Sequence, residues 1–239
     1  MDLRHQVAIL TGASGGIGQA LALALGQQGA ALALIGRNKR KLDSLASKLQ
    51  NGAARCYSTD LGDDQELEAT ANALGKDWAS VDILIHAAGV TTLGPVESSR
   101  KEDLDANYRI NVRAPYLLTQ ALLPALKKNK GQIVFINSTA GLQARGELTQ
   151  YAASKHALKA VADGLRDEVN QSGVRVLNLF LGRTATPMQA WTCRQEGREY
   201  RPELLIQPED VASVVVNALL LPRTAEVTEI RMRPLAKSY

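Results

Sequence analysis

At 239 residues the chain is near the upper length that one hydrophobic core can serve, and no proline-, serine- or charge-rich stretch divides it. Hydrophobic residues make up 45% of the chain and charged residues 22%, which excludes a disordered chain and a membrane-embedded one. The net charge is +4, but the basic residues are scattered among acidic ones and lack interleaved aromatics, so we expect no nucleic-acid partner.

Membrane insertion, secretion and metal binding are not indicated either. The most apolar stretch, residues 20–33, is interrupted by glycines and glutamines and falls short of the about 18 apolar residues of a membrane span. The first residues lack the features of a secretory signal, so we expect a cytoplasmic protein. Cys56 and Cys193 lie far apart without metal-type spacing, and we expect neither a metal site nor a disulfide.

Short apolar segments alternate with longer segments of helical periodicity along the whole chain. The expected strands cover residues 7–10, 31–35, 53–57, 83–86, 133–137, 174–180 and 227–232, and the expected helices cover residues 16–28, 39–50, 64–79, 104–128, 149–171 and 208–221. Continuous apolarity is typical of parallel strands that are buried on both faces. We therefore predict a single α/β domain, a Rossmann-type doubly wound, mostly parallel seven-stranded sheet with helices on both faces.

A glycine-rich turn follows the first expected strand. It reads Thr11-Gly-Ala-Ser-Gly-Gly-Ile-Gly18 and leads directly into a helix. Glycines are needed where backbone N–H groups approach a pyrophosphate and where a helix starts close to a sheet. The alternative is a purely structural turn. The spacing resembles the T-G-x-x-x-G-x-G motif of the short-chain dehydrogenase/reductase family, and the resemblance extends over nearly the whole chain.

The end of the second strand indicates the cofactor. No carboxylate stands there to bind the ribose 2′-OH of NAD; instead Arg37 can pair with the 2′-phosphate of NADP. Alternatively, Arg37 simply faces solvent. A second basic position of the family, within the glycine turn, is Gly15 here, which weakens the preference for NADP(H) slightly.

The resemblance implies further cofactor contacts. Asp60 and Leu61 match the pair that binds adenine in the family, and Thr184 and Thr186 match residues that reach the carboxamide and phosphate. The full expected cofactor set is Gly12, Ser14, Gly15, Gly16, Ile17, Gly18, Arg37, Asp60, Leu61, Ala88, Gly89, Tyr151, Lys155, Gly182, Thr184 and Thr186.

Tyr151 and Lys155 are four residues apart on one expected helix and therefore share a face. A nearby ammonium would lower the pKa of the phenol, so that Tyr151 can serve as acid/base. Ser138 lies 13 residues upstream at a strand end, where its hydroxyl can hold a substrate oxygen. Asn111 matches the family's fourth catalytic residue, which supports a water that contacts the lysine.

Two segments depart from the family pattern. His86-Ala87 stands where the family has two asparagines; backbone contacts to the cofactor could survive there, and we assign His86 a structural role. Leu181 replaces the proline before Gly182, which puts the stiffness of the following loop in doubt.

Residues 183–207, called the lid segment below, are too long for an ordinary connection and lie where the family places its substrate lid. Arginines and aromatics there could close over an anionic substrate, or the arginines could pair with neighbouring glutamates on a short helix. The residues concerned are Trp191, Arg194, Arg198, Tyr200 and Arg201 against Glu196, Glu199 and Glu203.

The leading interpretation is an NADP(H)-dependent oxidoreductase that moves a hydride between the nicotinamide and a small carbonyl or secondary alcohol. The alternatives are a 3-oxoacyl carrier-protein reductase and a catalytically silent module that senses NADP. The ending Glu229 to Pro234 looks more like the subgroup that acts on small 3-hydroxy acids and miscellaneous carbonyls. The resemblance also implies pairing through helices 104–128 and 149–171 into a homotetramer, or else a homodimer.

Overall fold

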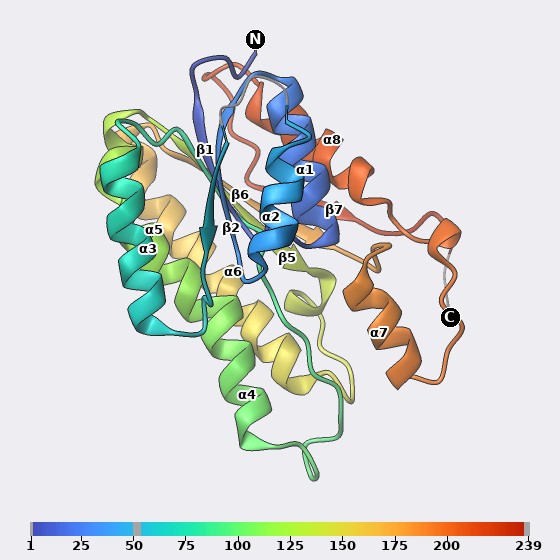
Figure 1. Cartoon of the computed structure of the whole chain (residues 1–239). Helices are drawn as coiled ribbons and strands as arrows, with labels where there is room; N and C mark the ends of the chain where they lie inside the picture. Colours follow the sequence, from blue (N-terminus) through green and yellow to red (C-terminus); the bar gives the residue numbers. More distant parts are fainter. Residues whose placement is uncertain (1, 50–53, 237–239) are drawn as a thin grey trace.

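Seven parallel strands form one sheet at the centre of the molecule (Figure 1). The structure is a computed structural model that describes residues 2–49 and 54–236. The strands are β1 (Val7–Thr11), β2 (Ala31–Gly36), β3 (Ala54–Ser58), β4 (Ile83–His86), β5 (Gln132–Ser138), β6 (Arg175–Leu181) and β7 (Glu229–Met232). Their order is β3-β2-β1-β4-β5-β6-β7. Strands β2 and β3 are added on one side of β1 and the last four strands on its other side, so the strand order reverses between β1 and β4. The predicted doubly wound fold is confirmed, and the sheet is parallel throughout.

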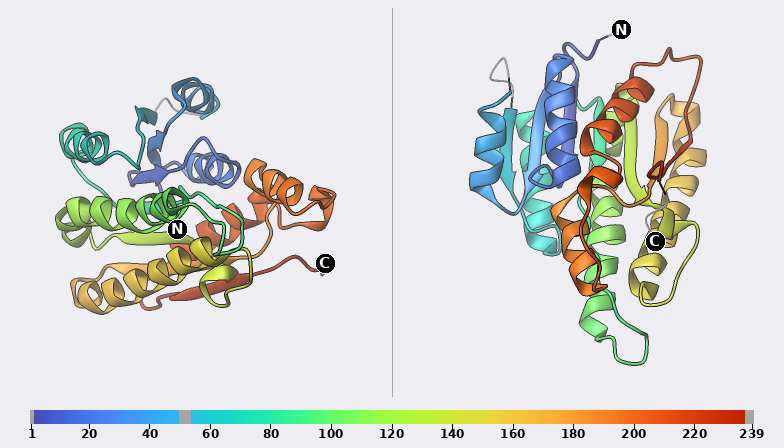
Figure 2. Two further views of the ribbon diagram at one scale, coloured as in Figure 1. Left: turned by 90° about the horizontal axis from the view of Figure 1, so that it is seen from below. Right: turned by 90° about the vertical axis from the view of Figure 1, so that its right-hand side faces the viewer.

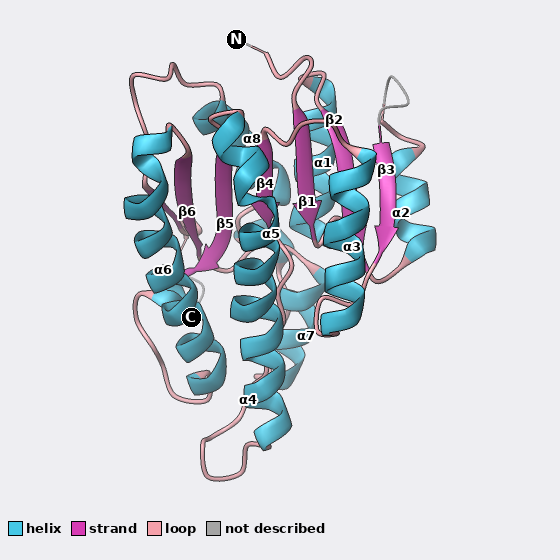
Figure 3. Cartoon of the chain, turned by 90° about the vertical axis from the view of Figure 1, so that its left-hand side faces the viewer, coloured by secondary structure: helices cyan, strands magenta, loops and turns pink. Residues whose placement is uncertain are grey.

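Helices cover both faces of the sheet. They are α1 (Gly16–Gln27), α2 (Lys39–Ala46), α3 (Asp64–Asp77), α4 (Lys101–Tyr108), α5 (Ala114–Lys128), α6 (Thr149–Val169), α7 (Pro187–Gln195) and α8 (Pro208–Leu219). Figure 2 shows the helix layers on either side of the sheet, and Figure 3 shows α3, α5 and α6 in front of the strands.

The layers follow from the alternation of side chains along each buried strand. Leu10 and Ile85 belong to the core beneath α1 and α8, whereas Ile9 and Leu84 belong to the core beneath α3, α5 and α6. Each strand therefore supplies apolar side chains to two cores. This explains why the strands read as continuous apolar runs.

Two predicted helix boundaries are wrong by more than two residues, and one of these two helices is also interrupted. Helix α2 ends at Ala46, not residue 50, because its last turn tightens into bonds from Lys48 N to Leu45 O and from Leu49 N to Ala46 O. Gln50, like residue 53 of the third expected strand, lies outside the described residues.

The expected helix 104–128 begins earlier, at Lys101, and is divided by a π-helical turn over Arg109–Arg113. Glu102 and Asp103 favour the earlier start because carboxylates suit the positive end of a helix. The last strand begins at Glu229 rather than residue 227; its partner Asn178 donates from its backbone N–H to Thr228 O just before it. Elsewhere the boundaries lie within about two residues of the predicted ones.

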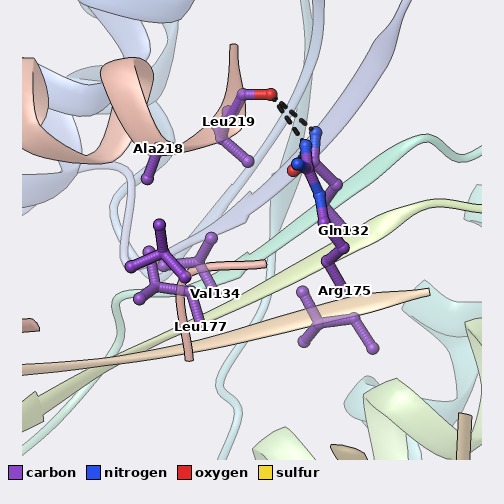
Figure 4. Close-up of a pocket in the computed structure, with 8 residues that line it drawn as sticks. Gln132, Val134, Arg175, Leu177, Ala218 and Leu219 are labelled. Atoms are coloured by element: carbon purple, nitrogen blue, oxygen red, sulfur yellow. Dashed lines mark hydrogen bonds between the residues drawn. The ribbon is translucent and has the colours of Figure 1, made fainter. Parts of the chain in front are cut away.

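The end of the sheet where β5 and β6 begin is closed by an arginine. Arg175 donates to the carbonyl of Leu219 (3.1 Å) and to Gln132 Oε1 (2.5 Å), and Gln132 donates to the same Leu219 carbonyl (3.1 Å) (Figure 4). The guanidinium thus satisfies carbonyls at the end of α8, where a cation is favoured. The small cavity beside it lies at the amino ends of the strands and is not the ligand site that the sequence predicts.

None of the helices in the described ranges is both long and apolar enough to cross a membrane.

Candidate active site

The carboxyl ends of β1, β4, β5 and β6 bring the predicted site residues to one edge of the sheet, at the bottom of the molecule in Figure 1. The glycine turn follows β1, residues 87–90 follow β4, Ser138 ends β5, and Gly182 follows β6. This edge, at the point where the strand order reverses, is where doubly wound sheets bind ligands.

The glycine turn is built so closely that side chains are excluded. Gly12 has a positive φ of 66°, and a Cβ atom there would lie 2.6 Å from the Ala88 nitrogen. A Cβ atom on Gly18 would lie 2.1 Å from the Gly12 carbonyl oxygen. Gly15 is the N-cap of α1, and within the described chain no side chain caps that helix start. The first N–H groups of α1 are therefore free to bind an anion such as a pyrophosphate.

Thr11 holds the segment after β4 against this turn. Its hydroxyl accepts from the N–H groups of Ala87 (3.1 Å) and Ala88 (3.2 Å) and lies 3.4 Å from the carbonyl oxygen of Ile85, to which it donates. Thr11 belongs to the glycine motif, but the motif alone does not predict this role for it. Its position between β1 and the glycines is the signal from which the role could have been inferred.

The predicted adenosine-binding residues gather at the end of β2. A Cβ atom on Gly36 would lie 3.0 Å from Ser14 Oγ, so Ser14 closes over the end of this strand. Arg37 is exposed, and no carboxylate of residues 2–49 and 54–236 forms a salt bridge with it. Asp60 uses one carboxylate oxygen to accept from Gly62 N (2.9 Å), which leaves the other for a ligand, and Leu61 is buried.

Ser138, Tyr151 and Lys155 come together where β5 faces the start of α6. The Ser138 side chain lies close enough to the Tyr151 phenol to lower its pKa. Lys155 Nζ lies 5.8 Å from the centre of the Tyr151 ring and donates to the Ile136 carbonyl at 3.2 Å. Asn137 ties the helix to the strand, because its amide donates to the Lys155 carbonyl at 3.2 Å. The strand end thereby fixes the position of both predicted catalytic side chains on α6.

The pKa of Tyr151 does not follow the expectation that Lys155 lowers it. Burial raises the pKa of the phenol above its usual value, and the hydrogen bond with Ser138 offsets part of that rise. Burial also lowers the pKa of Lys155 to about 8. The physical reason for the difference is that the Lys155 ammonium is bonded to a backbone carbonyl rather than to the phenol in this arrangement.

Asn111 lies in the π-helical turn, fully buried, and braces the loop after β4. Its amide oxygen accepts from Val90 N (2.9 Å), and its amide nitrogen donates to Val90 O (2.9 Å) and to Ser154 Oγ (3.0 Å). Ser154 in turn donates to the Tyr151 carbonyl (2.7 Å). A Cβ atom on Gly89 would lie 3.3 Å from Asn111 Oδ1 and 3.8 Å from Lys155 Nζ. Asn111 and Lys155 therefore both border Gly89.

The π-helical turn and Asn107, which precedes Asn111 by one turn, were not predicted. Asn107 is buried and donates to Thr92 Oγ1 at 2.7 Å. The wider turn of a π-helix produces this geometry, and the periodicity of residues in the sequence does not show where such a turn occurs. π-Helical turns occur often at functional sites.

His86 occupies a purely structural position, in keeping with its interpretation from the sequence. The ring is buried beneath α5, its Nε2 lies 2.8 Å from Thr119 Oγ1, and burial lowers the pKa of His86 to about 3. The imidazole is therefore neutral at physiological pH. Leu181, the second departure, is buried in the core beneath α1 and α8.

The lid segment contains α7, whose first residue follows the N-cap Thr186. The hydroxyls of Thr184 and Thr186 are both bonded within the loop, to the carbonyls of Gly182 (3.1 Å) and Thr184 (3.3 Å). A Cβ atom on Gly16 would lie 3.0 Å from Thr186 Cγ2, so the lid segment meets the glycine turn.

Two of the three lid arginines pair with neighbouring glutamates, as the second alternative expects, but they lie beyond the end of α7 rather than on the short helix. Arg198 lies 3.6 Å from a carboxylate oxygen of Glu196, and Arg201 lies 2.5 Å from one of Glu199. Both arginine side chains are about half exposed. Pairing with neighbouring glutamates, not an open anion site, describes these two arginines. The described part of the chain holds no group of three or more His, Cys, Asp or Glu side chains that could bind a metal ion.

The comparison with known proteins supports the family and the fold. The family model for short chain dehydrogenases matches residues 6–197. A protein of Staphylococcus epidermidis named an uncharacterized oxidoreductase is 30% identical over 234 residues, which cover 98% of this chain and 99% of the relative. The chain therefore belongs to the short-chain dehydrogenase/reductase family and is an oxidoreductase.

Solved structures of the same fold carry nicotinamide cofactors. An alcohol dehydrogenase from the archaeon Thermococcus sibiricus, complexed with 5-hydroxy-NADP, has a TM-score of 0.88 at 25% identity, covering 98% of this chain and 99% of that one. A metagenomic short-chain oxidoreductase in complex with NADP has a TM-score of 0.85 at 30% identity, with the same coverage.

Proposed function

We propose that this oxidoreductase transfers a hydride between NADP(H) and a carbonyl or secondary alcohol, with Tyr151 as the acid/base. The observation that carries the proposal is that Tyr151 meets two other predicted catalytic residues at the end of β5: Lys155 Nζ lies 5.8 Å from the centre of its ring, and the Ser138 side chain lowers the pKa of its phenol. Two hydroxyls at one point can hold a single substrate oxygen. Asn111, Ser138, Tyr151 and Lys155 form the proposed catalytic set.

The glycine turn fits a dinucleotide because Cβ atoms would fill the space at Gly12 and Gly18. We assign the pyrophosphate to the N–H groups of Gly16 and Ile17, with Thr184 and Thr186 beside them; Gly15 borders this position, but its own N–H donates to the Gly12 carbonyl at 2.9 Å. The adenine belongs at Asp60 and Leu61, and the 2′-phosphate at Arg37, whose guanidinium suits a phosphate. Ser14, Ala88, Gly89 and Gly182 line the path between these positions. When bound, NADP(H) supplies or takes up the hydride.

The chain's own groups handle the proton. In the reductive direction the Ser138 hydroxyl donates a hydrogen bond to the carbonyl oxygen, and the Tyr151 hydroxyl gives its proton to that oxygen. The resulting phenolate is stabilised by the Lys155 ammonium, whose Nζ lies 5.8 Å from the centre of the Tyr151 ring. Burial raises the pKa of Tyr151, so the phenol enters a reduction carrying the proton that it donates.

The substrate class can be tested with a panel of carbonyls that includes small 3-oxo acids, neutral ketones and a 3-oxoacyl thioester. Oxidation of NADPH or NADH is followed at the nicotinamide absorbance. Turnover of at least one class that depends on Ser138 and Tyr151 supports the proposal. Binding of NADPH without turnover of any class would favour the catalytically silent sensing module instead.

We further propose a homotetramer, or else a homodimer, formed through α4, α5 and α6. Leu104, Tyr108 and Tyr116 support this proposal because they are large apolar side chains that α4 and α5 leave 43%, 41% and 53% exposed. A monomer mass in sedimentation at micromolar concentration would contradict it. The whole chain is proposed to act as one dinucleotide-binding and catalytic domain with its lid in the segment 183–207.

A further inference from the structure

An ion pair links two distant residues of the lid segment, with one guanidinium nitrogen in contact with both carboxylate oxygens. Arg183 Nη2 lies 2.8 Å from Glu196 Oε1 and 2.7 Å from Glu196 Oε2. Arg183 lies two residues after the end of β6, whereas Glu196 is the C-cap of α7. The pair therefore joins the far end of the lid helix to the end of β6.

This pair is shielded from solvent to a degree that the other lid pairs are not. The side chains of Arg183 and Glu196 are 25% and 15% exposed, against 57% and 70% for Arg201 and Glu199. Arg183 Nη1 also lies 3.7 Å from the buried Cys193 sulfur. Because shielded charges interact more strongly than exposed ones, the pair of Arg183 and Glu196 is the one that can hold a helix in place.

The base of the lid segment is closed by backbone bonds. Ala185 N donates to Ile206 O at 2.8 Å, and Ile206 N donates to Arg183 O at 3.2 Å. These bonds fix where the segment leaves and rejoins the fold. They do not fix α7, which extends beyond them and lies beside the start of α1 in Figure 1.

The near end of α7 meets the glycine turn. Thr186 caps α7 by accepting from Gln189 N at 3.2 Å, and its Cγ2 would be 3.0 Å from a Cβ atom on Gly16. A rotation of α7 would therefore move Thr186 relative to the proposed pyrophosphate site. Among the salt bridges of the described residues, the pair of Arg183 and Glu196 is the one that joins the other end of the helix to the chain beside β6, because Arg198, which also contacts Glu196, follows it by only two residues.

We propose that Arg183 and Glu196 are positioning residues that hold α7 folded against the glycine turn before the cofactor binds. The inference rests on the proposed function, because it assigns the lid to the NADP(H) site. A site that is already ordered binds its ligand without an ordering cost. Loss of the pair should therefore weaken cofactor binding, while the proton-transfer groups on β5 and α6 keep their places.

The test uses four variants: Arg183→Met, Glu196→Gln, the double variant Arg183→Met/Glu196→Gln, and the matched control Arg201→Met. We expect the KM for NADPH to rise about tenfold in each single variant while kcat stays within about twofold, since coupled contacts typically carry effects of this size. The double variant should be no worse than either single one. Arg201→Met should leave both parameters unchanged, because its ion pair is exposed.

The double variant separates positioning from direct contact. If Arg183 touched the cofactor itself, its loss would add to the loss of Glu196, and additive effects would overturn the proposal. An unchanged KM in both single variants, or a fall in kcat at unchanged KM, would overturn it as well.

Limited trypsin digestion tests the position of α7 without any cofactor. We expect faster cleavage after Arg194 in Arg183→Met and Glu196→Gln than in the wild type and in Arg201→Met. Trp191 emission in a Trp78→Phe background should shift in the same two variants. Equal cleavage and equal emission in all variants would overturn the proposal that Arg183 and Glu196 hold α7 in place. Failure of the wild type to bind NADPH would instead overturn the proposed function.

Discussion

His86 Nε2 lies 2.8 Å from Thr119 Oγ1, and the imidazole stacks on Phe135 with 5.0 Å between the ring centres. The second ring nitrogen, Nδ1, is buried without a hydrogen-bond partner among the described residues. A charged imidazolium would have no compensating partner there, so burial lowers the pKa of His86 to about 3. The ring is thus retained in its neutral form across the physiological range.

The first prediction concerns stability in acid. Because the pKa of His86 is lower in the folded than in the unfolded chain, the stability it permits is present above pH 6.5 and is lost as the pH falls toward 3. We expect His86→Asn to flatten the decline in the free energy of unfolding between pH 6.5 and pH 4, by on the order of 3 kcal/mol. Urea unfolding at each pH measures it, with the exposed His156→Asn as control. Identical slopes in His86→Asn and the wild type would contradict the prediction.

The second prediction concerns Thr11. In Thr11→Val the shape is retained, but the N–H groups of Ala87 and Ala88 lose their acceptor. We expect a loss of about 2 kcal/mol of unfolding free energy, because unpaired buried N–H groups cost 1–3 kcal/mol. The KM for NADPH should rise as well, since residues 87–89 border the glycine turn. Thr11→Ser keeps the hydroxyl and should retain most of the stability and a KM for NADPH near that of the wild type. If Thr11→Ser lost as much stability as Thr11→Val, the methyl group rather than the hydroxyl would be responsible.

Much of the fold and site could be predicted because the signals are local. The glycine turn between an apolar strand and a helix fixes its own geometry, and the i, i+4 spacing of Tyr151 and Lys155 sets them on one helix face. Continuous apolarity predicted strands that the structure buries on both faces. These features depend on residues within a few positions of one another.

What escaped prediction depends on contacts between distant segments. Residue periodicity cannot show that Nζ of Lys155 bonds to Ile136, nor that burial dominates the pKa of Tyr151. The π-helical turn that carries Asn111 and the pairing of Arg183 with Glu196 likewise arise only when tertiary packing places the partners side by side. The charges of the lid segment were visible in the sequence, but which of them pair was not.

The third prediction sets stability against activity at Lys155. The pKa of this buried ammonium is lowered to about 8, so at pH 7 the folded state carries a charge that burial disfavours. Lys155→Met should abolish turnover and yet raise the free energy of unfolding at pH 7 by about 1–3 kcal/mol, the shift being worth 1.36 kcal/mol per pH unit. The wild type gains stability as the pH rises from 8 toward 10.5, so the gap should narrow at pH 9.5. Urea unfolding at pH 7 and 9.5 measures it; a less stable Lys155→Met at pH 7 would refute the prediction.

The fourth prediction isolates the proton carried by Tyr151. Tyr151→Phe removes the hydroxyl but keeps the ring, so NADPH should bind nearly as in the wild type while kcat falls by about 10²-fold or more. The exposed Tyr116→Phe should behave as the wild type with regard to turnover. Steady-state kinetics and a cofactor titration measure the two effects separately. If Tyr151→Phe retained more than about a tenth of kcat, another group would have to donate the proton.

The last prediction concerns cofactor choice at Arg37. The guanidinium is exposed at the end of β2, and no carboxylate of the described chain forms a salt bridge with it, so it is free to pair with a 2′-phosphate. We expect the wild type to have a higher kcat/KM with NADPH than with NADH. Arg37→Met, which only removes the attraction, should reduce that ratio by about tenfold, because hydrogen bonds to charged groups contribute about 1.5–3 kcal/mol. Arg37→Asp adds repulsion of the phosphate and offers an acceptor to a ribose 2′-OH, so it should lower the ratio further or reverse it. In Arg37→Met, kcat/KM with NADH should change little. A parallel loss of kcat/KM with both cofactors would show that Arg37 supports the fold rather than binding the 2′-phosphate. Equal kcat/KM for both cofactors in the wild type would contradict the predicted preference for NADPH.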